Sequence, residues 1–281
     1  MSRSLHPEAA AILARLQHEG VTALYHFTSV KNLPYICREQ ALLSKENLIT
    51  KGIWSHIETG GNDLSLDLDQ RNDNWNKVPL SLTPYLPMAY YRKRDQHICY
   101  FIIGPEVAGL SGVVFTDTNA ASSTHNRGQG LKGLNYINFG VIFSLTRGDK
   151  DTWKRYIQAE VLVPESVPFE YITQIAFVSN ASMKYAEKLC GSSPHPPFSI
   201  QKRLFADSQR APEGAVNFPH VIELIRDCSI FGIPWIGSPL EGYFSNYKDE
   251  YSPLVGYFAS QNGSYSPLPY DLPTIEQSRL Y

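Results

Sequence analysis

The sequence predicts an α+β protein in which short strands form the middle of the fold and helices surround them. Two observations carry this prediction. Apolar runs rich in β-branched and aromatic residues recur between polar loops in the middle of the chain, which is typical of strands. Segments with apolar residues at helical spacing, or with capping residues at their start, lie around these runs. No internal repeat is evident.

The first helix is predicted where an Ala-rich segment with helical spacing ends at Gly20. Thr28 and Ser29 are suitable caps for a second helix, and Leu42-Leu43-Ser44 is expected to turn out of it. Pro84 and Pro87 end a strand and open a short helix. The expected helices are residues 7–18, 30–39, 88–91 and 182–189, with a further capped helix at 217–228.

The strands are expected where β-branched and aromatic residues cluster. They are residues 22–27, 78–83, 97–103, 112–115, 161–163 and 172–178. Residues 45–77 are polar and rich in Asn, Asp and Gly, so we expect long loops with a little local structure there, and residues 119–133 are expected to be a loop. Long loops in a compact domain usually carry function.

Composition sets limits on compartment and partners. The 281-residue chain is 43% hydrophobic and 19% charged, which is ordinary for a soluble protein. Its net charge of -2 and pI of about 6.4 give no overall basic field, so a nucleic-acid substrate would need a local basic patch. The N-terminal residues lack a signal core and no apolar run is long enough to span a bilayer. We therefore expect a cytoplasmic protein without a membrane partner.

Cysteine and histidine spacing argues against a metal site and against a disulfide framework. The four cysteines, at positions 37, 99, 190 and 228, are scattered without paired spacing. Cys37 stands in an apolar helical context, where packing is a more common role than nucleophilic attack. His56 and His125 are expected in loops with no second ligand at metal spacing. No metal cofactor is expected.

A carboxylate stands at the start of one predicted strand. Residues 154–164 read KRYIQAEVLVP, a basic stretch followed by Gln158, Glu160 and an apolar run. Alternation puts Gln158 and Glu160 on one face of the strand start and Val161 and Val163 on the other. Most glutamates at strand starts only face water, but a carboxylate at a strand mouth behind a basic loop is well placed to meet a polar substrate.

A second polar motif, Tyr25-His26-Phe27-Thr28, lies at a strand-to-helix junction. The start of a helix offers unpaired backbone N–H groups to a phosphate or a carboxamide. The alternative for His26 is a strand histidine bonded to the backbone, and this stretch alone does not decide between the two.

The hexapeptide Gly128-Gln129-Gly130-Leu131-Lys132-Gly133 matches the dinucleotide-binding fingerprint letter for letter. It follows a polar loop rather than a buried strand, and no βαβ unit surrounds it, so we predict a mobile loop instead of a Rossmann site.

A basic cluster precedes Glu160 and consists of Arg147, Lys150, Lys154 and Arg155. It is either a solvated face or the local phosphate contact that the net charge does not supply.

Taken together, these stretches resemble the DarT family, bacterial toxins that ADP-ribosylate bases of single-stranded DNA. The resemblance covers residues 24–178 and its motifs appear in family order. The matching residues are Tyr25-His26-Phe27-Thr28, Asn32-Leu33, Leu42-Leu43-Ser44, Val78-Pro79, Pro84, Pro87-Met88-Ala89-Tyr90, Phe115-Thr116-Asp117, Lys154-Arg155 and Gln158-Ala159-Glu160-Val161-Leu162-Val163.

The resemblance implies an ADP-ribosyltransferase fold, in which a split central β-sheet flanked by helices holds the co-substrate NAD⁺ in its cleft. His26, Phe27 and Thr28 match the family's NAD⁺-contacting motif. Tyr35 and Leu43 fall on two further NAD⁺-contacting positions.

It also implies the catalytic residues. Glu160 matches the catalytic glutamate, which stabilises positive charge at the ribose and takes a proton from the incoming base. The family's essential arginine precedes the Val-Pro strand, where Arg71 is the candidate for holding the diphosphate, in a loop that aligns poorly. Gln158 would orient the acceptor.

The acceptor implied by the resemblance is single-stranded DNA. We expect Lys154, Arg155 and Arg127 to contact its backbone and Tyr156 to stack on a base. The family often has Arg-Ser-Pro-Met at residues 85–88 and a third basic residue at position 156, and these departures leave the target base and the choice of DNA over RNA open. The alternatives are transfer to RNA or protein, NAD⁺ hydrolysis, or a catalytically silent nucleotide-binding module.

The resemblance further implies a toxin that has a macrodomain-type antitoxin as its partner. We expect residues 1–205 to form the ADP-ribosyltransferase domain. After the prolines at 194, 196 and 197 the chain changes character, and residues 206–281, dense in Tyr, Gly and Pro, are expected to be a C-terminal extension packed on that domain.

Overall fold

One eight-stranded sheet organises the part of the chain that the computed structural model describes, residues 3–59, 72–85, 88–89, 98–143 and 150–205. All neighbouring strands are antiparallel except β9 and β10. In spatial order they are β10 (Phe198–Ile200), β9 (Ile172–Phe177), β4 (Ile98–Ile103), β1 (Leu24–Ser29), β3 (Lys77–Ser81), β7 (Glu160–Pro164), β5 (Val114–Thr116) and β6 (Arg127–Gln129).

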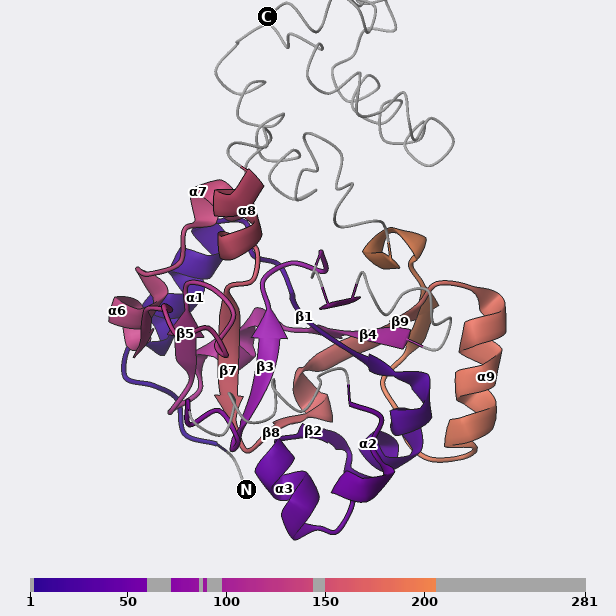
Figure 1. The fold of residues 1–281 in the computed structure, drawn as a ribbon. Coiled ribbons are helices and arrows are strands. Elements are labelled where there is room, and N and C mark those ends of the chain that lie inside the picture. The colour runs from indigo at the N-terminus through magenta and orange to yellow at the C-terminus, as the bar shows by residue number, and fades with distance from the viewer. Residues whose placement is uncertain (1–2, 60–71, 86–87, 90–97, 144–149, 206–281) are drawn as a thin grey trace, which may run out of the picture. The chain divides into compact units, whose positions relative to one another are not determined.

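The sheet is split in its middle, between β1 and β3. These two strands share the single register pair Tyr25↔Ser81, whereas β1 pairs with β4 along its whole length and β3 does so with β7. In Figure 1, β3 and β7 run almost vertically while β4 and β9 cross the view, so the two halves of the sheet diverge from their junction. The predicted α+β fold with a split central sheet is confirmed.

Helices flank both halves of the sheet. Helix α9 (Asn180–Cys190) lies beside β9, and α2 (Leu33–Glu39) packs against α9 (Figure 1). Below the sheet in this view lie α3 (Lys45–Thr50) and a two-stranded sheet of β2 (Ala41–Leu43) and β8 (Ser166–Pro168). The other half carries α1 (Ala9–His18), α6 (Gly130–Leu134), α7 (Phe139–Ile142) and α8 (Lys150–Tyr156).

Short 3₁₀ turns complete the elements. They are η1 (Val30–Asn32), η2 (Trp54–His56), η3 (Pro105–Gly109), η4 (Phe169–Tyr171) and η5 (Lys202–Phe205). Residues Met88 and Ala89 are helical, as expected, while the rest of that predicted helix lies outside the described residues.

Of the three apolar clusters among the described residues, the two larger ones hold most of the sheet. The larger one includes Leu16 of α1, Phe101 of β4 and Val161 of β7, each fully buried. The smaller one, on the opposite face, groups Tyr100 and Ile102 with Phe205, whose ring meets that of Tyr100 edge-on at 5.1 Å between centroids. Strand β4 contributes side chains to both clusters because its residues alternate between the two faces of the sheet.

The predicted cap is confirmed at Ser29, whose Oγ accepts a bond from the N–H of Lys31 at 3.3 Å. Cys37 is buried as expected, but the structure brings its Sγ within 3.5 Å of the Sγ of Cys190, across the α2–α9 contact. The bond to Cys190 and burial both raise the pKa of the Cys37 thiol, so Cys37 is a packing residue.

Several short elements differ from the sequence predictions. Residues 42–44 do not simply turn but belong to β2 and to the cap of α3, where Ser44 accepts a bond from Asn47 N–H at 3.2 Å. Residues 45–77 therefore include a helix, and residues 119–133 contain β6 and the start of α6. Of the basic residues before Glu160, Lys150, Lys154 and Arg155 lie on α8 rather than in a loop. Each of these elements is short and depends on tertiary partners.

The glycine-rich hexapeptide forms the end of a strand and most of a helix rather than a loop. Gly128 lies in β6, which is antiparallel to β5, and Gly133 lies on α6. A methyl group on Gly133 would collide with the carbonyl of Gly128, so the glycines permit a tight turn of the chain back on itself. The rejection of a Rossmann site is confirmed, because no parallel strand pair surrounds this turn.

Candidate active site

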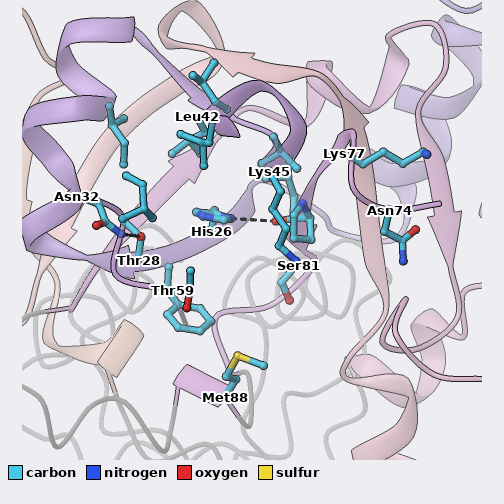
Figure 2. A pocket seen from close by; sticks show the side chains of 18 of the residues that line it. His26, Thr28, Asn32, Leu42, Lys45, Thr59, Asn74, Lys77, Ser81 and Met88 are labelled. Atoms are coloured by element: carbon cyan, nitrogen blue, oxygen red, sulfur yellow. Dashed lines mark hydrogen bonds between the residues drawn. The ribbon is translucent and has the colours of Figure 1, made fainter. Parts of the chain in front are cut away.

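A cavity of about 320 Å³ opens where the two halves of the sheet diverge. Strands β1, β3 and β7 line its floor, and α2, β2 and α3 form one wall. The opposite wall is the turn of residues 119–121, together with Gln158. Figure 2 shows His26 at the centre of the lining, with Thr28 and Asn32 on one side and Lys77 and Asn74 on the other.

Glu160 begins β7 and lies between two neighbouring strands, opposite Ser81 of β3 and Thr116 of β5. Its carboxylate is half-buried, and Oε2 accepts a hydrogen bond from the backbone N–H of Ala120 at 3.0 Å. Glu160 and Gln158 both line the cavity, whereas Val161 is in the main core. The predicted alternation of faces at this strand start is therefore confirmed.

His26 lies on β1 with its ring edge-on to Phe101, at 6.5 Å between centroids. Its Nδ1 is 3.0 Å from the carbonyl oxygen of Pro79, across the split. Burial lowers the pKa of His26, although the bond to Pro79 opposes this effect, so the neutral ring dominates at neutral pH. A carbonyl only accepts, so Nδ1 carries the proton and Nε2 is left as a hydrogen-bond acceptor. His26 is thus both backbone-bonded and part of the cavity lining.

The other residues expected to contact NAD⁺ line the same cavity. The ring of Phe27 lies 6.1 Å from that of Tyr100, and Thr28 accepts a bond from Asn32 Nδ2 at 2.9 Å. Tyr35 on α2 stacks on His56, with centroids 5.7 Å apart, and Leu43 ends β2 on the same wall. Segments that are distant in sequence thus converge on one cavity.

A shallower groove adjoins the cavity. Its lining is Thr118, Asn119, Ala121, Ser122, Thr124, Asp151, Lys154, Arg155 and Gln158, of which Asn119, Ala121 and Gln158 also line the cavity. Three of the predicted acceptor residues, Lys154, Arg155 and Gln158, therefore lie along this groove.

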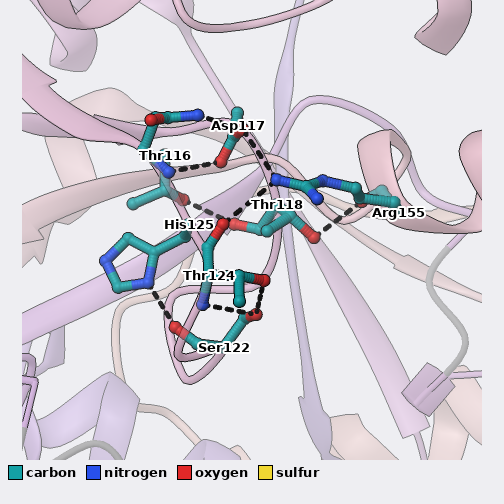
Figure 3. Close-up of polar contacts among 8 residues, drawn as sticks. Thr116, Asp117, Thr118, Ser122, Thr124, His125 and Arg155 are labelled. Atoms are coloured by element: carbon teal, nitrogen blue, oxygen red, sulfur yellow. Dashed lines mark hydrogen bonds and ion pairs between the residues drawn. The ribbon is translucent and has the colours of Figure 1, made fainter.

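Arg155 also stabilises the protein around the groove (Figure 3). Its Nη2 lies 3.3 Å from the carboxylate of buried Asp117 and donates to the carbonyl of Thr124 at 3.1 Å. Asp117 further accepts bonds from the backbone and side-chain N–H groups of Asn126, at 2.8 and 2.9 Å. The side chain of Arg155 remains 42% exposed, so the same guanidinium also faces the groove.

Other candidates are not brought to the cavity or the groove. Tyr156 packs against the main core and lines a separate hollow with Arg15 and Tyr136. Arg127 donates to the carbonyl of Asn72 at 2.6 Å and lines neither space. Arg71 and Arg147 lie outside the described residues.

Two asparagines at the site were not predicted as site residues, although Asn32 stands among the residues that carry the family resemblance. Asn32 is buried and bonds both polar groups of the Glu58 backbone, each at 2.9 Å, which fastens that segment to the end of β1. Asn74 lines the cavity from the turn before β3. Asparagine is common in loops, so neither residue carries a distinguishing local signal.

Solved structures with the same fold are ADP-ribosyltransferases. Thermus sp. 2.9 DarT in complex with NAD⁺ matches with a TM-score of 0.52 and 20% identity, over 66% of this chain and 97% of the other. The same protein in complex with ADP-ribosylated ssDNA matches with a TM-score of 0.54 and 18% identity, over 72% of this chain and 99% of the other. Thermosipho africanus DarTG in complex with ADP-ribose matches with a TM-score of 0.55 and 22% identity, over 66% of this chain and 51% of the other. No curated protein matches the chain. These matches show that the chain has the fold of the DarT structures.

The family model described as "ssDNA thymidine ADP-ribosyltransferase, DarT" matches residues 25–205, more than half of the chain. The chain belongs to the DarT family, and it is an NAD-dependent enzyme of that family.

No group of three or more His, Cys, Asp or Glu side chains is placed to hold a metal ion within the described residues. Those same ranges contain no helix with the length and apolar character needed to cross a membrane.

Proposed function

We propose that this chain transfers ADP-ribose from NAD⁺ to the base of thymidine in single-stranded DNA, with Glu160 as the catalytic residue. The observation that carries the proposal is the convergence of His26, Thr28 and Tyr35 with Glu160 on one cavity, from the three elements β1, α2 and β7. The family model supports thymidine as the acceptor.

The cavity suits the chemistry of NAD⁺. Its volume is at the lower end of the usual range for small-molecule pockets, and its lining combines aromatic rings with a few polar groups. Phe27 and Tyr35 bring aromatic rings to the lining, while Nε2 of His26 offers an acceptor for a hydroxyl or amide N–H. Arg71, before β3, is proposed to pair with the diphosphate, since a guanidinium matches two phosphate oxygens at once.

Glu160 acts on the reacting ribose carbon in this scheme. Bound NAD⁺ supplies a C–N glycosidic bond whose electron pair leaves with nicotinamide. The carboxylate stabilises the positive charge that develops at the ribose. It then takes the proton from the thymine ring nitrogen as that nitrogen forms the new bond to carbon. Gln158, on the same face of the strand, orients the base.

The acceptor strand is proposed to follow the adjoining groove. Lys154 and Arg155 supply its positive charge, in a protein whose net charge is -2. Because Gln158 and Asn119 line both spaces, a base in the groove lies next to the cavity. Only an unpaired or flipped base presents its ring nitrogen in this way, which favours single-stranded DNA.

We further propose a toxin role with a macrodomain-type antitoxin as partner. This proposal rests on family membership and on the likeness to Thermosipho africanus DarTG. Co-expression with a macrodomain protein that removes ADP-ribose from DNA should relieve growth inhibition, and inhibition that persists would contradict it.

The test of the activity is nicotinamide release from NAD⁺, measured with and without thymidine-containing single-stranded DNA, with mass spectrometry of nucleosides and proteins. The wild type should release nicotinamide in a DNA-dependent manner and label thymidine. Glu160→Gln should lose at least about 100-fold in rate at unchanged melting temperature.

Glu170→Gln is the matched control, because Glu170 is exposed on η4, outside the site, and should behave as wild type. ADP-ribose found on protein or RNA alone would show that single-stranded DNA is not the acceptor. Full activity of Glu160→Gln would exclude Glu160 as the catalytic residue.

A further inference from the structure

We propose that Asn74 is a positioning residue for Glu160 and acts through the backbone of Ala120. This inference rests on the proposed function, in which Glu160 is the catalytic carboxylate. Asn74 lies in the turn before β3 and Glu160 begins β7, and the turn of residues 117–121 connects the two.

The connection consists of hydrogen bonds to both polar groups of one residue. The N–H of Ala120 donates to Oε2 of Glu160 at 3.0 Å. The carbonyl of Ala120 accepts from Nδ2 of Asn74 and from Nδ2 of Asn72, each at 3.0 Å. The methyl group of Ala120 is buried against Val114 and Leu162. These contacts fix the direction in which the Ala120 N–H points.

The other end of the same turn is fixed independently. Asp117 accepts bonds from Asn126 and pairs with Arg155, and the hydroxyl of Thr116 donates to the carbonyl of Thr118 at 2.7 Å. The N–H that meets Glu160 thus lies between two anchored ends. A charge-assisted bond from a fixed backbone donor holds the carboxylate in one rotamer.

Asn74 has one polar side-chain atom that is paired and one that is not, which fold stability does not explain. The residue is 6% exposed, and its Oδ1 is buried without a hydrogen-bond partner. An unsatisfied buried acceptor lowers stability. Turning the amide over would not help, because Oδ1 would then face the carbonyl of Ala120. What this side chain contributes is therefore its hydrogen bond to the carbonyl of Ala120. The N–H of Ala120 in turn donates to the reacting carboxylate of Glu160.

The test compares Asn74→Ala and Asn74→Asp with Asn47→Ala. Asn47 is the matched control, since its Nδ2 donates to one backbone carbonyl, that of Glu165 at 3.1 Å, and it does not line the cavity. For Asn74→Ala we expect kcat of transfer to fall about 10- to 100-fold, because a small displacement of a catalytic group is costly. The KM for NAD⁺ should stay within about twofold, since uniform binding is untouched.

Asn74→Asp keeps the shape of the side chain but replaces the donor with a second acceptor, so its kcat should fall at least as far as that of Asn74→Ala. The melting temperature of Asn74→Ala should match or exceed that of the wild type, because the unsatisfied acceptor is removed. Amide hydrogen exchange at Ala120 should be faster in both Asn74 variants and unchanged in Asn47→Ala.

Unchanged kcat in Asn74→Ala, with Glu160→Gln inactive, would overturn this inference and leave the proposed function standing. Activity in Glu160→Gln would overturn the proposed function instead. A raised KM for NAD⁺ at constant kcat would make Asn74 a ligand contact. A lowered melting temperature with parallel losses in kcat and binding would make it a structural residue. Either result would contradict positioning.

Discussion

The protonation state of His26 follows from where the chain places it. Its Nδ1 meets the carbonyl of Pro79 because β1 and β3 separate just beyond their one register pair. A backbone carbonyl there selects one tautomer of the neutral ring and leaves Nε2 without a proton. The imidazole can then accept a hydrogen bond from a ligand but cannot donate one.

Replacing His26 with Ala should therefore weaken NAD⁺ binding while sparing the fold. Loss of one hydrogen bond predicts a dissociation constant raised by up to about tenfold. NAD⁺ should raise the melting temperature of the wild type with concentration, and less so that of the variant. His18→Ala, on an exposed position of α1, is the control. A wild-type melting temperature indifferent to saturating NAD⁺ would contradict the proposed binding site.

The same residue predicts a pH dependence of stability. Burial lowers the pKa of His26 in the folded protein, so the unfolded chain binds the proton first as pH falls below about 6.5. Stability should decrease from there until pH reaches the folded-state pKa, and become level below it. Melting temperatures of wild type and His26→Gln, measured across this range, should differ in slope, with the shallower decline in the variant. Parallel curves would show that His26 titrates alike in both states.

At the same scale, the sequence predicts some site residues and not others. Glu160 and His26 stand in short motifs next to strands, where side-chain alternation already assigns them a face. Asn74 acts through a contact with Ala120, which is distant in the sequence. Such contacts depend on how loops cross the sheet, so no local pattern indicates them.

At the scale of elements, the strands with apolar runs were predictable, whereas the short strands β2, β6, β8 and β10 were not. Strand β4 is apolar at every position and buried throughout, so its composition alone identifies it. Strand β2 has three residues and exists because β8 pairs with it. Helix α8 begins next to residues that the structure does not describe, and its basic residues suggested a loop. The predicted basic surface before Glu160 is thus on a helix.

Lys154 and Arg155 both lie on α8, but we expect them to have different roles. Lys154→Ala should weaken binding of single-stranded DNA and reduce the slope of log affinity against log salt by about 0.7, the loss of one phosphate contact. Its melting temperature should not change. Binding measured at several salt concentrations tests this, with Lys184→Ala on exposed α9 as the control of equal charge. An identical slope in Lys154→Ala and wild type would argue for a solvated face.

Arg155→Ala should show the same binding defect and, in addition, a loss of about 1–2 kcal/mol in stability. The reason is that Arg155 bonds buried Asp117 and the Thr124 carbonyl, although its partial exposure limits the value of the ion pair. Chemical denaturation measures this difference. Equal stability of Lys154→Ala and Arg155→Ala would mean that the contacts of Arg155 with Asp117 and Thr124 do not stabilise the protein.

At the scale of the whole molecule, the family match ends at a residue that packs in the hydrophobic core. The match closes at residue 205, and Phe205 packs on Tyr100 in the smaller apolar cluster. The sequence predicted a domain of residues 1–205 from a change in composition, and this boundary remains a prediction. It requires that the last turn, η5, belong to the core rather than to the extension.

A chain shortened to residues 1–205 should therefore fold, bind NAD⁺ and show a cooperative thermal transition. A chain ending at Ile200 should be much less stable, because it lacks Leu204 and Phe205, and the loss of a buried aromatic ring alone costs about 3–5 kcal/mol. Phe205→Ala in the full chain separates the ring from the truncation and should reproduce most of the loss. Circular dichroism melting with and without NAD⁺ measures all three. If residues 1–205 fail to fold while the full chain folds, then the extension supplies part of the core, and the predicted domain boundary is wrong.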